Sequence, residues 1–344
     1  MGKYYDGTKL LSLTDLYGRK PEIYIVTSNR TGGKTTYFNR LMVNRWKQNR
    51  EKFMLEYRFQ YEINDVPDKF FKDIGSLFFP EYEMTARKIC QNHAVELFLN
   101  DISCGYAVSL NSAEAVKKHS HMFKDVKRML LDEFQSETNT YCPDEIKKFE
   151  SIHTSVARGD GEQVRYVPVF MVGNPVTILN PYYTKLGISS RLNSETKFLR
   201  GDGFVLEQGF VESASQAQKE SGFNRAFAND EYVAYSSEAI YLNDNYAFIE
   251  KPVGKSKYVC TLKYKGCNFA IREYLEQGII YCDDRADMSF PFKITVTTDD
   301  HNINYVMLKH NDLFLINMRY YFEKGCFRFK DLRCKEAVLA SLSY

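Results

Sequence analysis

The sequence lacks the features of a membrane-spanning or secreted chain. No apolar run approaches the roughly 18 residues that suggest a transmembrane helix. The first residues, Met1 to Asp6, lack the apolar core of a signal peptide. A strong net charge is also missing, because 46 Lys and Arg oppose 44 Asp and Glu, which excludes a histone-like basic protein. We therefore expect an intracellular protein with no membrane partner.

Cysteine and histidine patterns for metal binding are missing as well. The eight cysteines form no CxxC pair, and the six histidines form no HExxH motif. Such spacings mark zinc sites, and an intracellular compartment keeps thiols reduced. The cysteines are therefore expected to be buried, reduced thiols.

The chain does contain enough apolar material for substantial cores. Of its 344 residues, 44% are hydrophobic and 15% are aromatic, which excludes a disordered chain, and the length favours about two domains. Strand-like and helical segments alternate in the first 200 residues, which is typical of a parallel sheet with helical crossovers. The expected strands are 22–27, 53–57, 106–110, 129–131 and 167–172, and the expected helices include 35–53 and 145–152.

The pattern changes after about residue 200. Residues 212–230 are polar and small, with few candidate core residues, and we interpret them as a helical linker. Short strand-like segments with turn residues follow, and a last helix is expected at 332–342. The expected strands of this part are 246–250, 258–264, 268–272, 278–282 and 293–297. The predicted division is a domain at 1–200, a linker at 201–235 and a domain at 236–344.

The strongest local signal is Ser-Asn-Arg-Thr-Gly-Gly-Lys-Thr at 28–35. It is close to the phosphate-loop pattern GxxxxGK[ST], with Ser28 in place of the first glycine, and it lies between an expected strand and an expected helix. In such a loop, backbone N–H groups face the phosphates, the lysine reaches the β- and γ-phosphates, and the adjacent hydroxyl binds Mg²⁺. The residues expected to bind ATP are Ser28, Asn29, Arg30, Thr31, Gly32, Gly33, Lys34, Thr35 and Thr36. The alternative is a chance turn before a helix.

A second expected strand ends in two acids. The apolar residues 129–131 are followed by Asp132 and Glu133, so both acids would lie beside the phosphate loop at the carboxyl edge of the sheet. Asp132 is the expected partner of Thr35 in holding Mg²⁺, and Glu133 is the candidate general base for the attacking water. This adjacency favours a catalytic-glutamate ATPase over a GTPase.

Two more candidate catalytic residues fit this arrangement. Asn174 follows the expected strand 167–172 and would act as a sensor of the γ-phosphate, or alternatively only begin an Asn-Pro turn. Arg158 lies on a glycine-containing turn. In ring ATPases an arginine from a neighbouring subunit contacts the transition state, so Arg158 is the candidate for that role, with a surface arginine as the alternative.

Four segments carry a resemblance to a known family. They are SNRTGGKT at 28–35, LLDEF at 130–134, VGNPVTILNPYY at 172–183 and ITVTTDDHNIN at 294–304. In this order and spacing they resemble the DNA-packaging (encapsidation) ATPases of small phi29-type tailed phages, over most of the chain. The resemblance implies a homo-oligomeric ring motor, pentameric in this family, that uses ATP and Mg²⁺. It would drive double-stranded DNA through the portal of a procapsid, and a structural RNA takes part in some relatives.

The resemblance also implies a fold and a location. The fold is α/β: a P-loop ATPase with a mainly parallel sheet flanked by helices, a small helical linker, and an α+β ribonuclease-H-like domain that has lost its nuclease activity. The protein would work in the host cell cytoplasm, transiently on the portal vertex of the procapsid. Four of the residues discussed above match the family's phosphate, metal and catalytic positions, Asn174 matches its polar sensor, and Arg158 falls near its trans-acting arginine. The four are Lys34, Thr35, Asp132 and Glu133.

DNA contacts and nuclease acids are less clearly marked. The candidate DNA-phosphate contacts are Lys117, Lys118 and Arg58, with a solvated helix face as the alternative for the two lysines. Glu137 lies in a segment expected to face DNA, where an acid does not suit phosphate. Paired acids near the C-terminus could build a two-metal nuclease site, but they lie in or beside expected turns, where acids are common. These acids are Asp283, Asp284, Asp287, Asp299 and Asp300.

The predicted function is therefore an ATP-driven double-stranded DNA translocase that packages a viral genome into a preformed procapsid. One alternative is a cellular DNA translocase or helicase. The other is a nucleotide-gated nucleic-acid-binding or structural subunit without turnover, in which a base such as Glu133 would have no use.

Overall fold

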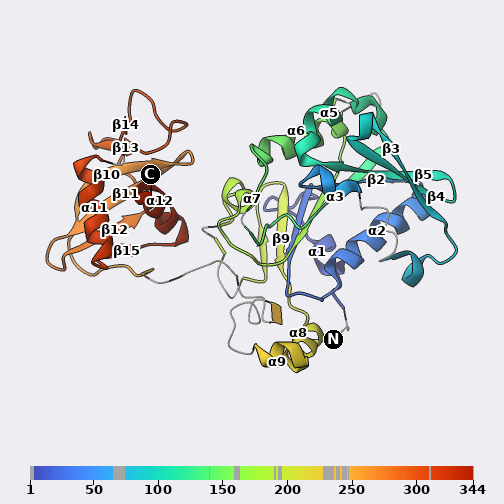
Figure 1. Cartoon of the computed structure of the whole chain (residues 1–344), viewed down its shortest axis with the longest axis horizontal. Helices are drawn as coiled ribbons and strands as arrows, with labels where there is room; N and C mark the ends of the chain where they lie inside the picture. Colours follow the sequence, from blue (N-terminus) through green and yellow to red (C-terminus); the bar gives the residue numbers. More distant parts are fainter. Residues whose placement is uncertain are drawn as a thin grey trace. The chain divides into compact units, whose positions relative to one another are not determined.

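The computed structural model describes residues 4–64, 74–138, 140–158, 163–189, 191–192, 196–227, 236–237, 241, 246, 248–309 and 311–343. The chain divides into two compact units, residues 1–243 and residues 244–344 (Figure 1). Each unit has its own sheet and its own hydrophobic core, as separate domains do. Among the described residues, no helix has both the length and the apolar composition that crossing a membrane requires.

The first unit is built on a nine-stranded sheet with the order β3-β4-β5-β2-β6-β7-β1-β9-β8. The central strands run parallel: β1 (Ile23–Thr27), β2 (Lys52–Tyr57), β5 (Ile102–Ser109), β6 (Val126–Asp132), β7 (Val169–Gly173) and β9 (Phe204–Gln208). Antiparallel strands form the two edges: β3 (Met84–Ile89), β4 (Ala94–Leu99) and β8 (Phe198–Arg200). Strands β1 and β7 are almost entirely buried, because helices cover both faces of a parallel sheet.

Helices form one apolar core on each face of this sheet. On one face, α2 (Lys34–Asn49) contributes Trp46 to a core that includes Val26. On the other face, α6 (Glu145–Ala157) contributes Ile152. The shorter α-helices are α1 (Thr8–Ser12), α3 (Gln60–Asn64), α5 (Ala113–Lys118), α7 (Pro181–Lys185), α8 (Glu212–Glu220) and α9 (Gly222–Ala226). The 3₁₀ turns are η1 (Cys90–Asn92), η2 (Leu110–Ser112) and η3 (Ser120–Phe123).

The structure confirms the predicted fold class, and each strand predicted in the first 200 residues is present. The helix predicted at 35–53 is shorter, because Arg50 adopts a left-handed conformation (φ 56) after Asn49 and β2 begins at Lys52. Strands β3 and β4 were absent from the prediction. Residues in β3 alternate between half-buried and exposed positions, with Arg87 and Lys88 on this edge strand, so its apolar signal is weak.

The second unit holds a six-stranded sheet with the order β14-β13-β10-β11-β12-β15. The strands are β10 (Lys257–Tyr264), β11 (Cys267–Tyr274), β12 (Ile279–Asp283), β13 (Lys293–Thr295), β14 (Val306–Met307) and β15 (Phe327–Phe329). Strands β10 to β12 are antiparallel, and β13 and β14 follow in parallel beside β10. This is the ribonuclease-H-like arrangement that the resemblance implies. The helices α11 (Leu313–Glu323) and α12 (Leu332–Ser343) contribute to its core.

One strand predicted for this part of the chain comes out differently, and one helix was not predicted. The strand predicted at 246–250 lies partly outside the described residues, and Ile249 forms a single bridge to Phe329. Helix α11 was not predicted, because its sequence, LFLINMRYYFE, is mostly apolar and its faces differ little in hydrophobicity.

The predicted linker at 201–235 begins with a strand of the first sheet. Strand β9 pairs in parallel with β1, and β8, which ends at Arg200, pairs with β9. The helices α8 and α9 then follow within the same compact unit, which extends to residue 243. The first unit therefore needs the chain beyond residue 200 to complete its sheet.

The acids of the second unit are engaged in structural contacts. Asp283 accepts a hydrogen bond from Arg272 Nε at 2.8 Å, and Asp284 is ion-paired with Lys330. Asp300 accepts from the backbone N–H of Gly266 at 2.9 Å. Within the part of the chain that the structure describes, no group of three or more Asp, Glu, His and Cys side chains could hold a metal ion. The eight cysteines are free thiols, five of them buried.

Candidate nucleotide-binding site

The loop at 28–33 joins β1 to α2 at the carboxyl edge of the parallel sheet. Gly33 precedes the helix in the left-handed conformation (φ 86), which glycine adopts without strain. Ser28, which replaces the first glycine of the phosphate-loop pattern, is buried and does not have a positive φ. The departure from the pattern therefore imposes no left-handed strain at this position.

The segment after β9, residues 209–211, is hydrogen-bonded to this loop and to the end of β1. The side chain of Asn29 donates to Val211 O at 3.0 Å and accepts from Val211 N at 2.9 Å, and Gly209 N donates to Thr27 O at 2.7 Å. A Cβ atom on Gly32 would lie only 2.9 Å from Val211 Cγ2, so glycine is required for this close approach. Residues 182 positions apart in the chain thus fix the loop.

Lys34 places its ammonium group inside the loop. The residue is 6% exposed, and Nζ donates to Ser28 O at 3.0 Å, Asn29 O at 3.2 Å and Asn174 Oδ1 at 3.1 Å. Burial lowers the pKa of Lys34 to about 8, although the nearby Asp132 carboxylate opposes this shift. Burying a cation is costly unless an anion accompanies it. A bound triphosphate would supply that anion, so the environment of Lys34 fits the predicted role.

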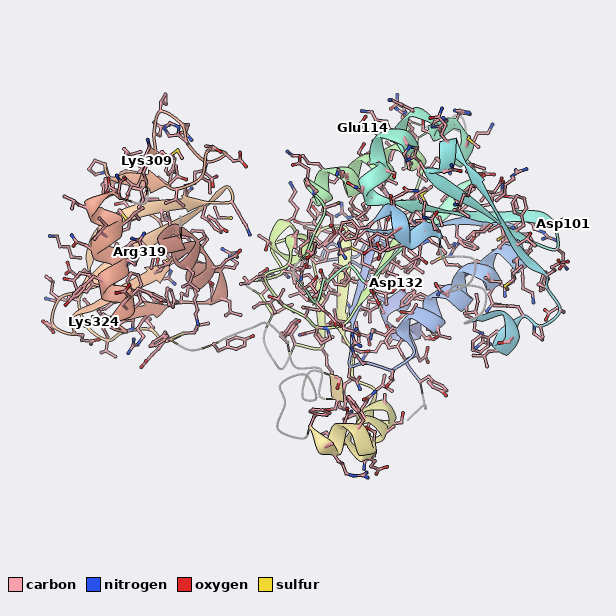
Figure 2. The ribbon with its side chains drawn as sticks, in the orientation of Figure 1. Asp101, Glu114, Asp132, Lys309, Arg319 and Lys324 are labelled. Atoms are coloured by element: carbon pink, nitrogen blue, oxygen red, sulfur yellow. The ribbon has the colours of Figure 1, made fainter. Side chains whose placement is uncertain are left out.

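Thr35 and Asp132 meet where the predicted Mg²⁺ would bind. Thr35 Oγ1, in the first turn of α2, donates to Asp132 Oδ1 at 3.1 Å; Figure 2 labels Asp132. Hydroxyl and carboxylate oxygens are hard ligands of the kind that Mg²⁺ prefers. The donor set therefore fits this ion.

Glu133 leaves the end of β6 in an unusual backbone conformation. Its φ of 52 lies in the left-handed region, which is uncommon for a residue with a side chain. Its backbone N–H donates to Asp132 Oδ1 at 3.1 Å, and its exposed side chain lines the same cavity as Lys34 and Asn174. Such strain persists only where the surroundings fix it, and it is frequent at functional sites.

Arg58 supplies part of that restraint. Its Nη2 donates to Phe134 O at 2.8 Å and to Glu133 O at 3.3 Å, while its Nε donates to Glu145 Oε2 at 2.9 Å. The hydroxyl of Tyr182 donates to the other oxygen of Glu145 at 2.8 Å. Arg58 is only 8% exposed, so an arginine held this way cannot meet a DNA phosphate. This corrects the prediction of a nucleic-acid contact, since charge in a sequence does not reveal burial.

A cavity of about 1190 Å³ connects the site residues. Seven of the nine predicted ATP-binding residues line it: Arg30, Thr31, Gly32, Gly33, Lys34, Thr35 and Thr36. The other two, Ser28 and Asn29, present their carbonyl oxygens to Lys34. Glu137 forms an ion pair with Arg30, which gives this acid a partner in the phosphate loop. The cavity wall also includes residues that no local pattern marks: Tyr4, Gln218, Phe223 and Phe227.

Arg158 lies far from the nucleotide site of its own chain. It follows the last residue of α6, Ala157, whose carbonyl accepts from Arg165 N at 2.7 Å. The Arg165 guanidinium in turn donates to Val126 O, at the start of β6, at 3.0 Å. Asp132 ends the same strand, and at about 3.3 Å per residue the two ends of β6 are about 20 Å apart. Arg158 Nη2 itself donates to Ser120 Oγ at 3.1 Å.

Lys117 and Lys118 are the last residues of α5, and both are exposed. Because Ser120 follows this helix and contacts Arg158, the two lysines lie on the Arg158 side of the unit. Their contact with DNA stays a prediction.

Glu56 is a buried acid that the sequence patterns do not mark. It lies on β2 beside Leu131 of β6, it is 0% exposed, and neither carboxylate oxygen has a hydrogen-bond partner in the described structure. Burial raises the pKa of Glu56 from 4.5 to about 8, because the charged form loses its hydration. The folded protein therefore holds a proton here that the unfolded chain releases above about pH 4.5.

The substitution Glu56→Gln is expected to stabilise the protein at alkaline pH. The stabilising effect of the protonated acid is fully present below pH 4.5 and is lost as the pH rises through about 8, whereas glutamine cannot ionise. At about 1.4 kcal/mol per pH unit, the free energy of unfolding of the variant relative to the wild type should be about 3 kcal/mol larger at pH 8.5 than at pH 5.5. Urea unfolding at both pH values measures this, with the exposed Glu150→Gln as control. A difference that is the same at both pH values would contradict the buried-proton account.

A parallel sheet with a phosphate loop after its first strand, and an acidic pair after a neighbouring one, places the first unit in the P-loop nucleotide-binding class. The sequence profile of the Podovirus DNA encapsidation protein (Gp16) family matches residues 2–342. The chain therefore belongs to that family, which confirms the resemblance.

Individual relatives agree over nearly the full length. The DNA packaging proteins of Bacillus phages PZA and phi29 are each 24% identical over 330 residues, covering 95% of this chain and 93% of theirs. A solved chain of the bacteriophage Phi-29 viral genome packaging motor assembly superposes with a TM-score of 0.71 at 23% identity, covering 100% of this chain and 98% of that one. A solved chain of the Phi-28 gp11 DNA packaging motor superposes with a TM-score of 0.62 at 16% identity, covering 98% of this chain and 97% of that one. These likenesses establish the fold of the whole chain.

Proposed function

We propose that this protein hydrolyses ATP to move double-stranded DNA into a preformed phage procapsid. One observation carries the proposal: Lys34, the Thr35–Asp132 pair, Glu133 and Asn174 all line a single cavity. Each supplies a chemical function that phosphoryl transfer to water requires. The names of the curated relatives, "DNA packaging protein", support the assignment of the work to which hydrolysis is coupled.

In this proposal the phosphate loop and Lys34 bind the β- and γ-phosphates. Thr35 and Asp132 would hold Mg²⁺, which neutralises charge on the phosphate oxygens. Glu133 orients the attacking water and accepts its proton. Asn174, whose Oδ1 accepts a hydrogen bond from Lys34 Nζ at 3.1 Å, would respond to the γ-phosphate. Arg58 does not touch the nucleotide and positions the backbone on which Glu133 is carried.

Arg158 is proposed to act on the nucleotide of a neighbouring subunit. The roughly 20 Å between the two ends of β6 exclude a contact with its own site, so a transition-state role requires a second copy of the chain. A homo-oligomeric ring, pentameric as in the resembling family, provides that copy. Its further partners would be the portal of the procapsid and, as in some relatives, a structural RNA. The proposed location is the host cytoplasm, transiently at the portal vertex.

The proposal predicts phosphate release that DNA stimulates and that depends steeply on protein concentration. Concentration matters because each complete site needs an arginine from a neighbour. Steady-state phosphate release should be measured across protein concentration, with and without double-stranded DNA, with Lys34→Ala as the inactive control. A flat baseline in all conditions would favour a nucleotide-gated binding subunit. DNA translocation without any procapsid or portal would favour a cellular translocase.

A further inference from the structure

The cavity at the phosphate loop extends over an apolar wall that a triphosphate does not use. Its volume of about 1190 Å³ exceeds the roughly 300–1,000 Å³ of most small-molecule pockets. Three aromatic residues of this wall are strongly exposed: Tyr4 at 63%, Phe223 at 74% and Phe227 at 52%. Exposed aromatic rings gathered beside a polar site are a common sign of a binding surface.

Tyr4 is held against the phosphate loop by its neighbour. The backbone N–H of Tyr5 donates to Gly32 O at 2.8 Å, and the Tyr5 hydroxyl donates to Glu207 at 2.6 Å. The Tyr4 ring lies 3.5 Å from the point where a Cβ atom on Gly33 would be. The ring therefore borders the phosphate cradle directly.

The other two rings are Phe223, on α9, and Phe227, which directly follows α9. This segment is itself hydrogen-bonded to the loop. Phe223 and Phe227 contact each other with ring centroids 5.0 Å apart. Gln218, on α8, donates from its side chain to Thr31 Oγ1 at 3.3 Å, and it accepts from the Asn224 amide at 2.6 Å. The start of the described chain (blue) and α8–α9 (yellow) lie close together in Figure 1, in agreement with the shared cavity lining.

We propose that Tyr4, Phe223 and Phe227 form a stacking subsite for the base of the nucleotide whose phosphates Lys34 binds. The inference rests on the proposed function and adds to it the part of the ligand that the phosphate-loop pattern does not address. An aromatic base presents an apolar face to such rings, and each base–aromatic stack contributes about 1–3 kcal/mol. Because the rings belong to two segments far apart in the chain, the bound base would connect the N-terminal segment to α8–α9.

Binding of two ligands to the full-length protein tests the subsite. ATP has a base, whereas inorganic tripolyphosphate has only the phosphates, and isothermal titration with each separates the two parts of the site. Phe223→Ala should weaken ATP binding about 5- to 150-fold and leave tripolyphosphate binding unchanged. Phe223→Trp should retain the wild-type affinity for ATP. Tyr17→Ala is the matched control, because Tyr17 is 66% exposed, does not line the cavity and lies outside the segment that holds the phosphate loop.

Two results would overturn the subsite. One is an unchanged affinity of Phe223→Ala for ATP. The other is an equal loss of affinity for ATP and for tripolyphosphate, which would mean that Phe223 only supports the phosphate loop. Tyr4→Ala, tested in the same way, is expected to behave like Phe223→Ala. The proposed hydrolysis is judged separately: if the wild type shows this binding pattern but never releases phosphate, the subsite stands and the ATPase assignment fails.

Discussion

The variant Glu133→Gln is expected to bind ATP like the wild type and to release phosphate about 10²–10⁴-fold more slowly, the usual contribution of a general base. Glutamine keeps the size and polarity of the side chain but cannot accept the proton of the attacking water. The phosphate loop, Lys34 and the Thr35–Asp132 pair remain intact, so binding should persist. Hydrolysis and binding should therefore respond very differently to this single change.

Single-turnover phosphate release and equilibrium ATP binding, measured on the same preparation, check this expectation. Glu114→Gln is a suitable control, because Glu114 is an exposed acid on α5 and does not line the cavity. A hydrolysis rate for Glu133→Gln within a factor of two of the wild type would exclude Glu133 as the base. Equal losses of binding and hydrolysis would instead indicate a structural role for this strained position.

The variant Arg158→Ala is expected to lose about 10³–10⁵-fold in hydrolysis rate, the range measured for arginines that complete a phosphoryl-transfer site. This loss corresponds to about 4–7 kcal/mol of transition-state stabilisation. Because Arg158 lies at the opposite end of β6 from Asp132, its effect should pass between subunits. Mixing Arg158→Ala with Glu133→Gln should therefore restore part of the activity, since the second variant provides an arginine to an intact site of the first.

The mixing experiment needs its own controls. Each variant should be nearly inactive alone, and mixing Lys34→Ala with Glu133→Gln should restore nothing, because neither has an intact site. Lys147→Ala removes an exposed cation on α6, the helix that Arg158 follows, and should keep the wild-type rate. Full activity of Arg158→Ala alone would contradict the proposal that Arg158 acts on the nucleotide of a neighbouring subunit.

The sequence was most informative where the chemistry is local. The phosphate loop lies within eight consecutive residues and the acidic pair within two, and both follow short apolar strands whose pattern is clear. Parallel-sheet geometry then places their ends together. For these reasons the sequence could predict that Lys34, Thr35 and Asp132 lie together.

The remaining features depend on partners that are remote in the chain. In the sequence Arg58 resembles a free surface cation. In the structure it pairs with Glu145, 87 residues away, and donates a hydrogen bond to the backbone carbonyl of Glu133. The aromatic wall combines Tyr4 with Phe223 of α9 and the following Phe227, and no sequence periodicity connects such positions. Edge strands such as β3 alternate in burial and carry charges, so they resemble surface loops in a sequence.

The hydrogen bonds between the phosphate loop and the segment after β9 have a consequence for folding during synthesis. Asn29 precedes its partner Val211 by 182 residues, and a ribosome adds about 5–20 residues per second. A nascent chain would therefore carry the loop for about 10–40 seconds before the residues that hold it emerge. During this interval β1 also lacks its neighbour β9, which leaves an unpaired strand edge. The candidate nucleotide site therefore becomes structurally complete only when the first unit does.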